Sequence, residues 1–189
     1  MPNPMTVDRV VGGATGGAQQ GTKFAPAITL VTTTEKIVLD QTGGVATVYA
    51  MPQSGPSASG SYDVFKFIVR ATFKCTTGGS ATNIVTLYLG NPSTIVTGNA
   101  LATITSQSLA TLTGSGFLEF HGIWDSTSLI ISGIQFGGYG TTAVSGTIVT
   151  NTGLTAANLA ALKFSISSKN GSSVTGTTFQ LGEFTSETA

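Results

Sequence analysis

Residues 62–75 read YDVFKFIVRATFKC, and their apolar side chains recur at every second position. The odd positions from Phe65 to Cys75 are all apolar, whereas the even positions include two lysines, an arginine and a threonine. Successive side chains of a strand point to opposite faces of a sheet. This stretch therefore predicts a long β-strand with one buried face and one solvent-facing face.

The same period of two recurs along the chain from Glu35 onward. Further strands are expected at 36–39, 45–50, 83–90, 101–105, 110–113, 117–124, 129–136, 144–150, 162–167 and 177–184. Turn-forming Gly, Ser, Thr and Asn residues separate them, which is typical of an antiparallel sandwich or barrel. The pattern predicts an all-β fold, an antiparallel β-sandwich of about 8–10 strands spanning residues 35–189.

Two hairpins and one short helix complete the expected organisation. Glycine-containing turns predict a hairpin between 62–75 and 83–90 and another between 36–39 and 45–50. Residues 155–162 contain a possible N-cap followed by good helix formers, so they predict a short crossover helix.

The predicted core follows from the apolar positions of these strands. In 117–124, one face carries Leu118, Phe120 and Trp124, and the other carries Glu119, His121 and Ile123. The residues assigned to the core are Phe65, Phe67, Val69, Phe73, Leu87, Phe120, Trp124, Phe164 and Phe179. Cys75 lies on the apolar face of its strand and is expected to be a small buried hydrophobe.

Residues 1–34 are expected to form an extended N-terminal arm. The prolines in Met1–Pro4 disfavour helix, and Gly12–Gly17 has few side chains to pack. The apolar residues of this segment that are assigned to a subunit interface are Val7, Val10, Val11, Phe24, Ile28, Leu30 and Val31. They favour an arm that contacts a neighbouring subunit, the alternative being a disordered terminus.

The composition excludes several classes of partner. The chain has 189 residues, 8 basic and 8 acidic side chains, and no net charge. A nucleic-acid partner is not expected, because phosphate affinity needs clustered Lys and Arg. One Cys and one His cannot make a disulfide framework or a Cys/His zinc site within one subunit. No apolar run is long enough for a membrane helix, and the Met1 end lacks the pattern of a secretory signal peptide.

Candidate catalytic residues form no specific motif, so no enzyme, cofactor or metal is expected. A glycosidase would need two carboxylates across a cleft, and Glu119 with Asp125 is the pair considered. His121 could serve as the base of a triad, but no G-x-S-x-G elbow accompanies it. The glycine groups at 12–17, 114–116 and 137–140 lack the strand–loop–helix setting of a phosphate loop and are expected to be turns.

Three aromatic residues could instead form a platform for a sugar. Tyr139 lies in the glycine-rich 137–140 segment, Tyr49 lies close to Pro52, and Trp124 alternates with apolar residues. The alternation favours a core position for Trp124 over display on the surface.

The low charge favours dense assembly. Gly, Thr and Ser number 25, 32 and 19, whereas charged residues are only 8% of the chain. Small side chains lose little rotamer entropy when a surface is buried, and zero net charge removes repulsion between copies. Few charges or prolines protect the sheet edges, which indicates edges covered by neighbours or by the arm.

Four stretches carry a resemblance to a known class of proteins. They are YDVFKF at 62–67, FLEFHGIWD at 117–125, LTAANLAALKF at 154–164 and FQLGEF at 179–184. Together with the arm and the strand pattern over 35–189, they resemble the jelly-roll decoration (cement) proteins of tailed-bacteriophage heads. Trimeric jelly rolls such as tumour-necrosis-factor-like domains share the pattern.

The resemblance implies a virion structural protein on the capsid surface. It implies a homotrimer at local threefold positions whose arms clamp neighbouring subunits, with the major capsid protein and its own copies as partners. A receptor- or glycan-binding module of a phage tail or fibre is the alternative.

Overall fold

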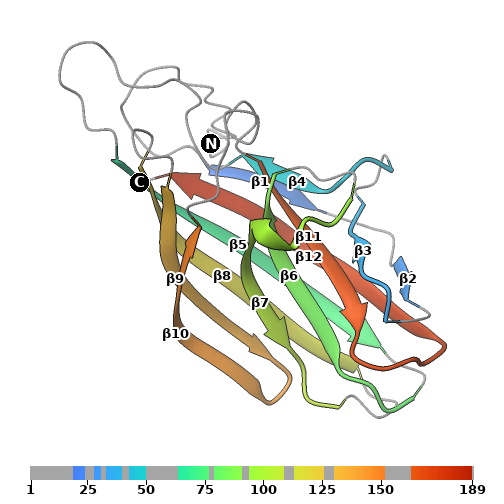
Figure 1. The fold of residues 1–189 in the computed structure, drawn as a ribbon. Coiled ribbons are helices and arrows are strands. Elements are labelled where there is room, and N and C mark those ends of the chain that lie inside the picture. Colours follow the sequence, from blue (N-terminus) through green and yellow to red (C-terminus); the bar gives the residue numbers. More distant parts are fainter. Residues whose placement is uncertain are drawn as a thin grey trace, which may run out of the picture.

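The computed structural model describes ten segments of the chain. They are residues 19–23, 28–30, 33–39, 43–49, 64–76, 79–90, 94–108, 113–125, 130–151 and 163–188. The predicted helix at 155–162 and the arm residues Val7, Val10, Val11, Phe24 and Val31 lie outside these segments. Within them the chain forms β-strands and one 3-10 turn (η1, Thr97–Asn99), in two antiparallel sheets that face each other (Figure 1). No helix in these segments could cross a membrane.

The larger sheet has the strand order β1-β12-β5-β8-β9-β10, and β2 also pairs with β12. Its strands are β1 (Gln19–Lys23), β2 (Ile28–Leu30), β5 (Val64–Thr76), β8 (Thr113–Asp125), β9 (Ile130–Tyr139), β10 (Thr142–Asn151) and β12 (Thr177–Thr188). The smaller sheet has the order β3-β11-β6-β7, and β4 also pairs with β11. Its strands are β3 (Lys36–Ile37), β4 (Thr47–Tyr49), β6 (Asn83–Leu89), β7 (Ala100–Thr105) and β11 (Lys163–Asn170).

The pairing has jelly-roll topology. β1 and β2 lie end to end along β12, since Lys23 pairs with Glu183 and Ile28 with Phe179. β3 and β4 lie end to end along β11 in the same way. With each couple taken as one strand, the two sheets have the two-Greek-key order of a jelly roll, in which the chain crosses between the sheets except at the β6–β7 connection. The β9–β10 hairpin extends the larger sheet beyond β8. The predicted all-β jelly-roll sandwich is confirmed.

The first jelly-roll strand comes from residues that the sequence assigned to the N-terminal arm. β1 and β2, with Ile28 and Leu30 in β2, pair with β12 of the same chain. Residues 19–23 and 28–30 therefore belong to the larger sheet of their own subunit. The jelly roll begins before residue 34, the limit predicted for the arm.

One of the two predicted hairpins does not form, and the other is reduced to a single antiparallel bridge. β5 and β6 lie in opposite sheets, so residues between them carry the chain across the sandwich. β3 and β4 are parts of one edge strand, interrupted by a loop whose ends meet at the Leu39–Val45 bridge. Gly43 in this loop has a φ of +84°, a backbone conformation that glycine adopts without strain.

Aromatic rings from both sheets fill the core. Phe67 stacks on Phe164 of the facing sheet with ring centroids 5.4 Å apart, and Phe73 packs against Tyr139 at 4.9 Å. The buried residues that the sequence assigned to the core are Phe67, Val69, Phe73, Leu87, Phe120, Trp124, Phe164 and Phe179. Phe65 lies in β5 opposite Trp124, and its side chain lies outside the described part of the structure.

Glycines inside β8 and β9 make room for these rings. A Cβ atom on Gly122 would lie 2.3 Å from the Phe67 ring, and one on Gly116 would lie 2.6 Å from the Phe73 ring. The predicted turns at 114–116 and 137–140 are therefore wrong for most of their residues, which lie in strands. Only Gly140 of these glycines occupies a turn, with a φ of +61°.

Candidate functional site

The outer face of the larger sheet brings polar and apolar side chains from four strands together. Side chains alternate along β5 and β8, so the neighbours of the core residues point away from the sandwich. Across β12, β5, β8 and β9, one row contains Thr185, Arg70, Glu119 and Phe136, and the next contains Glu187, Ile68, His121 and Ile134. The alternation of residues 62–75 and 117–124 predicts these faces correctly for Arg70, Glu119 and His121.

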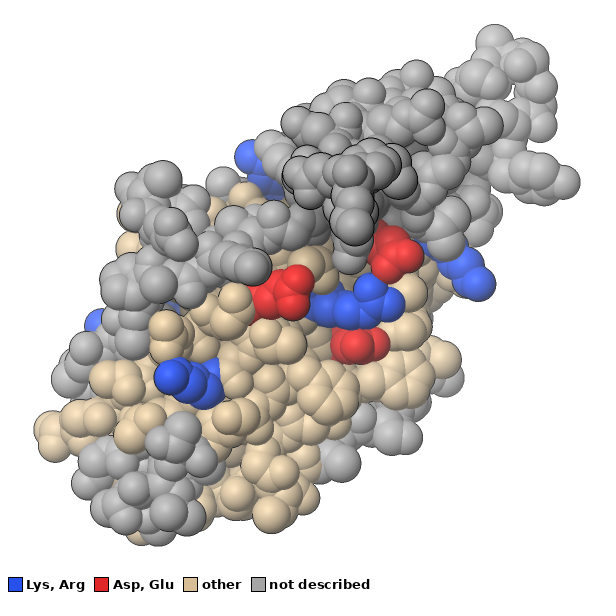
Figure 2. Space-filling model, turned by 180° about the vertical axis from the view of Figure 1, so that it is seen from behind, with Lys and Arg blue, Asp and Glu red and all other residues tan. Residues whose placement is uncertain are grey.

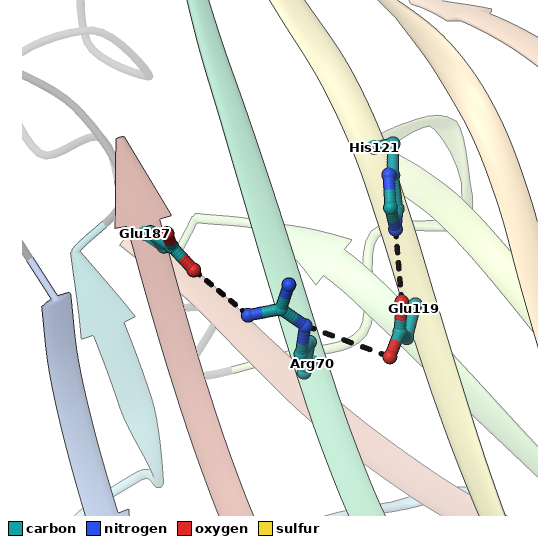
Figure 3. Close-up of polar contacts among 4 residues, drawn as sticks. All are labelled: Arg70, Glu119, His121 and Glu187. Atoms are coloured by element: carbon teal, nitrogen blue, oxygen red, sulfur yellow. Dashed lines mark hydrogen bonds and ion pairs between the residues drawn. The ribbon is translucent and has the colours of Figure 1, made fainter. Parts of the chain in front are cut away.

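Four of these residues form a connected group, here called the Arg70 cluster: Arg70, Glu119, His121 and Glu187. Nη1 of Arg70 lies 2.8 Å from Oε2 of Glu187, and Nε of Arg70 lies 3.5 Å from Oε1 of Glu119. Nε2 of His121 lies 2.8 Å from the other carboxylate oxygen of Glu119 (Figure 3). The cluster thus joins β12, β5 and β8 in a continuous chain of polar contacts.

The Arg70 cluster is internally paired. Each carboxylate has a cationic or hydrogen-bonding partner, and Arg70 lies between two carboxylates. Its side chains are partly exposed, and exposed ion pairs contribute less than about 1 kcal/mol each because water and salt screen them. The flanking carboxylates make Arg70 a poor site for an anion. The structural effect of the Arg70 cluster is to hold its polar side chains in fixed positions on this face of the sheet.

Exposed apolar side chains surround the cluster on β8 and β9. Phe117, Ile123 and Ile134 are 44%, 44% and 39% exposed. Phe136 is half-buried, and its ring meets the His121 ring edge-on at a centroid distance of 5.1 Å. These four apolar residues, Phe117, Ile123, Ile134 and Phe136, are called the outer patch. The molecule seen from behind shows a largely uncharged surface with basic and acidic groups gathered beside each other (Figure 2).

The arrangement does not provide a pair of catalytic carboxylates. Glu119 and Asp125 lie six residues apart on β8, on the same face, so they are about 20 Å apart along the strand. They cannot face each other across a cleft. Within the described segments no three His, Cys, Asp or Glu side chains are grouped to hold a metal ion. The His121 ring is hydrogen-bonded to Glu119.

Two side chains with nucleophilic or ligand-binding chemistry are buried instead. Burial raises the pKa of Cys75 to about 11, so the group stays a thiol near neutral pH. Tyr139 is fully buried, and its hydroxyl donates a 2.7 Å hydrogen bond to Oδ1 of Asn83. Burial raises the pKa of this phenol also, with smaller effects from Cys75.

The predicted sugar platform is therefore wrong for Tyr139, which belongs to the core. The reason is that Gly138 and Tyr139 continue β9 rather than forming a surface turn. Trp124 is buried as the alternation indicates. The side chain of Tyr49 lies outside the described part of the structure.

A second polar group lies on the smaller sheet, and no local pattern in the sequence marks it. Glu35 accepts hydrogen bonds from the hydroxyls of Tyr88, at 2.8 Å, and Ser167, and lies 3.5 Å from Nζ of Lys169. Burial and the hydrogen bond to Glu35 raise the pKa of Tyr88, which keeps the phenol protonated. The group ties the residue before β3 to β6 and β11, so its role is structural. Residues so far apart in sequence meet only after β6 and β11 pair.

Comparison with known proteins shows similarity in overall architecture at low sequence identity. The chain is 11% identical to a lectin described as UEA-II complexed with galactose, with a TM-score of 0.36 over 90% of this chain and 98% of that one. It is 12% identical to peanut lectin with a 9mer peptide, with a TM-score of 0.38 over 93% and 98% of the two chains. A protein of infectious bursal disease virus, Gx strain, gives 12% identity and a TM-score of 0.28 over 92% of this chain and 42% of that one.

With TM-scores this low, neither sugar binding nor capsid assembly is inferred from the likeness. No protein-family model matches the chain, and no curated protein matches its sequence.

Proposed function

We propose that this protein is a non-enzymatic structural protein of a virion, which decorates or cements a capsid by binding capsid subunits and its own copies. The observation that carries the proposal is the outer patch, where Phe117, Ile123 and Ile134 are exposed along one face of the adjacent strands β8 and β9. Exposed apolar side chains gathered on one sheet face are typical of an interaction surface. The major capsid protein is the proposed partner.

The polar part of the same face suits burial at such a contact. Burying an unpaired charge is costly, whereas Arg70 already lies between Glu119 and Glu187. A partner that covers the Arg70 cluster would not bury an isolated Arg70 charge, but it would have to offer a hydrogen-bond donor or a cation, because one guanidinium faces two carboxylates. The low charge of the chain also limits repulsion between neighbouring copies.

The proposed mechanism is mechanical. A copy that lies across the seam between two capsid subunits would bury its outer patch on both. Opening the seam would then expose apolar surface again, at about 25 cal/mol for each Å². Many copies would add these contributions over the shell.

The test is co-sedimentation with purified capsid shells that lack this protein. Wild-type protein is compared with a Phe117→Ser, Ile134→Ser double variant, and Val96→Ser is the control, because Val96 is 46% exposed and lies outside the outer patch. We expect the double variant to lose at least about tenfold in affinity, which corresponds to about 1.4 kcal/mol, and the control to bind like wild type. Absence of wild-type binding to shells, or equal binding by the double variant, would overturn the proposal.

A receptor- or glycan-binding role is the second candidate. The observation that favours it is the exposed Phe117 ring close to the hydrogen-bonding groups of the Arg70 cluster, since sugars are bound by such combinations of apolar and polar groups. A glycan array separates the two functions. Binding to a glycan that Phe117→Ser abolishes would favour the second role, and an array without hits would remove it.

A further inference from the structure

The two sheets have four edges in the described part of the chain, and three of them are interrupted or covered. The β1/β2 edge is divided between Lys23 and Ile28, and the β3/β4 edge is divided by the loop that closes at Leu39 and Val45. The third edge, β7, is blocked at Thr103 by a side chain of β9. The fourth edge is β10.

Gln135 binds the backbone of Thr103 in β7 as a paired strand would. Its Oε1 accepts a 2.9 Å hydrogen bond from the amide of Thr103, and its Nε2 donates to the carbonyl of the same residue. Gln107 acts on the β9–β10 turn, where its Oε1 accepts a 2.9 Å hydrogen bond from the amide of Thr141. These two glutamines attach the β9–β10 hairpin to the residues in and after β7, and so fix the position of β10.

β10 is a long edge strand with little of the usual protection against pairing. It covers ten residues with the sequence TAVSGTIVTN, and β9 is its only strand partner within the described segments. It contains no charged residue and no proline, the residue types that usually protect sheet edges. The single irregularity is a bulge between Ser145 and Thr147 in its pairing with β9.

We propose that β10 of one subunit pairs antiparallel with β10 of a second copy across a twofold axis, joining the two larger sheets into one. This pairing specifies how copies of the protein bind each other in the proposed function. It rests on the proposed function only for the expectation that copies associate. A strand edge offers alternating donors and acceptors, so an antiparallel copy of equal length is complementary to it. An uncharged strand also meets its own copy without like-charge repulsion.

The pairing has a consequence for the outer patch. β9, which carries Ile134 and Phe136, is the neighbour of β10. Two copies joined through β10 would therefore place both outer patches on the same face of one continuous sheet. A capsid subunit would then meet a surface twice as wide as one copy provides.

The test introduces a charged side chain at the middle of β10. Full pairing of two ten-residue strands brings Thr147 within about two positions of its symmetry copy. Thr147→Lys and Thr147→Glu are each examined by analytical ultracentrifugation, alone and as an equimolar mixture. We expect a wild-type dimer, monomers for each variant alone, and a restored dimer in the mixture. Thr105→Lys on β7 is the control, because Thr105 is exposed on an edge strand that the proposal leaves unpaired, and it is expected to remain dimeric.

Three results would overturn the pairing: a monomeric wild type, a Thr147→Lys protein that assembles like wild type, or a wild-type trimer. Hydrogen exchange on the wild-type protein keeps the test valid if a variant fails to fold. Alternate β10 amides should gain protection as protein concentration rises, and unchanged exchange would contradict the pairing. If Thr147→Lys assembles like wild type while shells still bind the protein, the pairing fails and the proposed function stands.

Discussion

The hydroxyl of Tyr139 donates a 2.7 Å hydrogen bond to Oδ1 of Asn83, and this bond connects β9 of the larger sheet to β6 of the smaller sheet. Both residues are fully buried. Asn83 also donates from Nδ2 to the Ser168 hydroxyl at 2.9 Å and to the Lys169 carbonyl at 3.1 Å. The amide of Asn83 therefore connects three strands at one end of the sandwich.

Replacing Tyr139 by Phe should destabilise the protein without changing its fold. The substitution removes one donor and leaves a buried amide oxygen with a weaker remaining partner, Ser168 at 3.3 Å. Such a loss costs about 1–3 kcal/mol. Urea unfolding measures it, and Thr178→Val, which removes an exposed hydroxyl, should change stability by less than about 0.5 kcal/mol. Equal stabilities for the two variants would show that the Tyr139 bond contributes nothing.

Adding one methyl group at Gly122 should have a large effect. The new Cβ would lie 2.3 Å and 2.6 Å from two atoms of the Phe67 ring, which is itself stacked on Phe164. Overpacking of this kind typically costs about 1–3 kcal/mol. The matched control is Gly98→Ala, where the Cβ meets nothing within 4 Å. Thermal unfolding should show a lower Tm for Gly122→Ala only, and a tolerated alanine would mean that Phe67 can move.

Stability should fall at alkaline pH partly because of Cys75. Its pKa rises from 9.0 in the unfolded chain to about 11 in the folded protein, mainly through burial. The folded state therefore holds the proton more tightly, and the contribution is complete below pH 9 and lost as the pH rises toward 11. Its upper limit is about 2–3 kcal/mol, since one pKa unit corresponds to about 1.4 kcal/mol.

Urea unfolding at pH 8, 9 and 10 tests this contribution. The wild-type protein should lose stability between pH 9 and 10 more steeply than Cys75→Ala. Parallel pH profiles would show that the thiol does not contribute. Tyr88 and Tyr139 also have raised pKa values, so they should add to the loss at higher pH in both proteins.

Arg70 should contribute little to stability despite its two carboxylate partners. Its ion pairs with Glu119 and Glu187 are partly exposed to solvent. Arg70→Met should therefore cost less than about 1 kcal/mol, and the difference from wild type should shrink in high salt. Urea unfolding at low and high salt measures both. A larger, salt-independent loss would indicate that the side chain acts mainly through packing.

The sequence predicts which face of a sheet a side chain occupies better than it predicts which strands pair. Alternation in 62–75 correctly places Phe67 and Phe73 inside and Arg70 outside, because side-chain direction is a local property of a strand. Which strands pair is decided by contacts distant in sequence, so the expected hairpin from β5 to β6 is wrong. Tyr139 was expected at the surface because the glycines beside it look like turn residues.

The same distinction applies to the candidate site. His121 and Glu119 are two residues apart on one strand, and alternation alone places them together on the outer face. Glu187 reaches Arg70 only because β12 pairs with β5, and Glu35 reaches Tyr88 only in the folded protein. No local pattern marks either acid.

The pairing of β1 with β12 also determines when the fold can be completed during synthesis. Gln19 lies opposite Glu187, so one of the first strands made waits for one of the last. Among the strands that the structure describes, β1 and β2 have no neighbour in the larger sheet other than β12. A nascent chain must therefore keep β1 and β2 unpaired until β12 has been made, which prolongs their exposure to aggregation and makes chaperone contact with them advantageous.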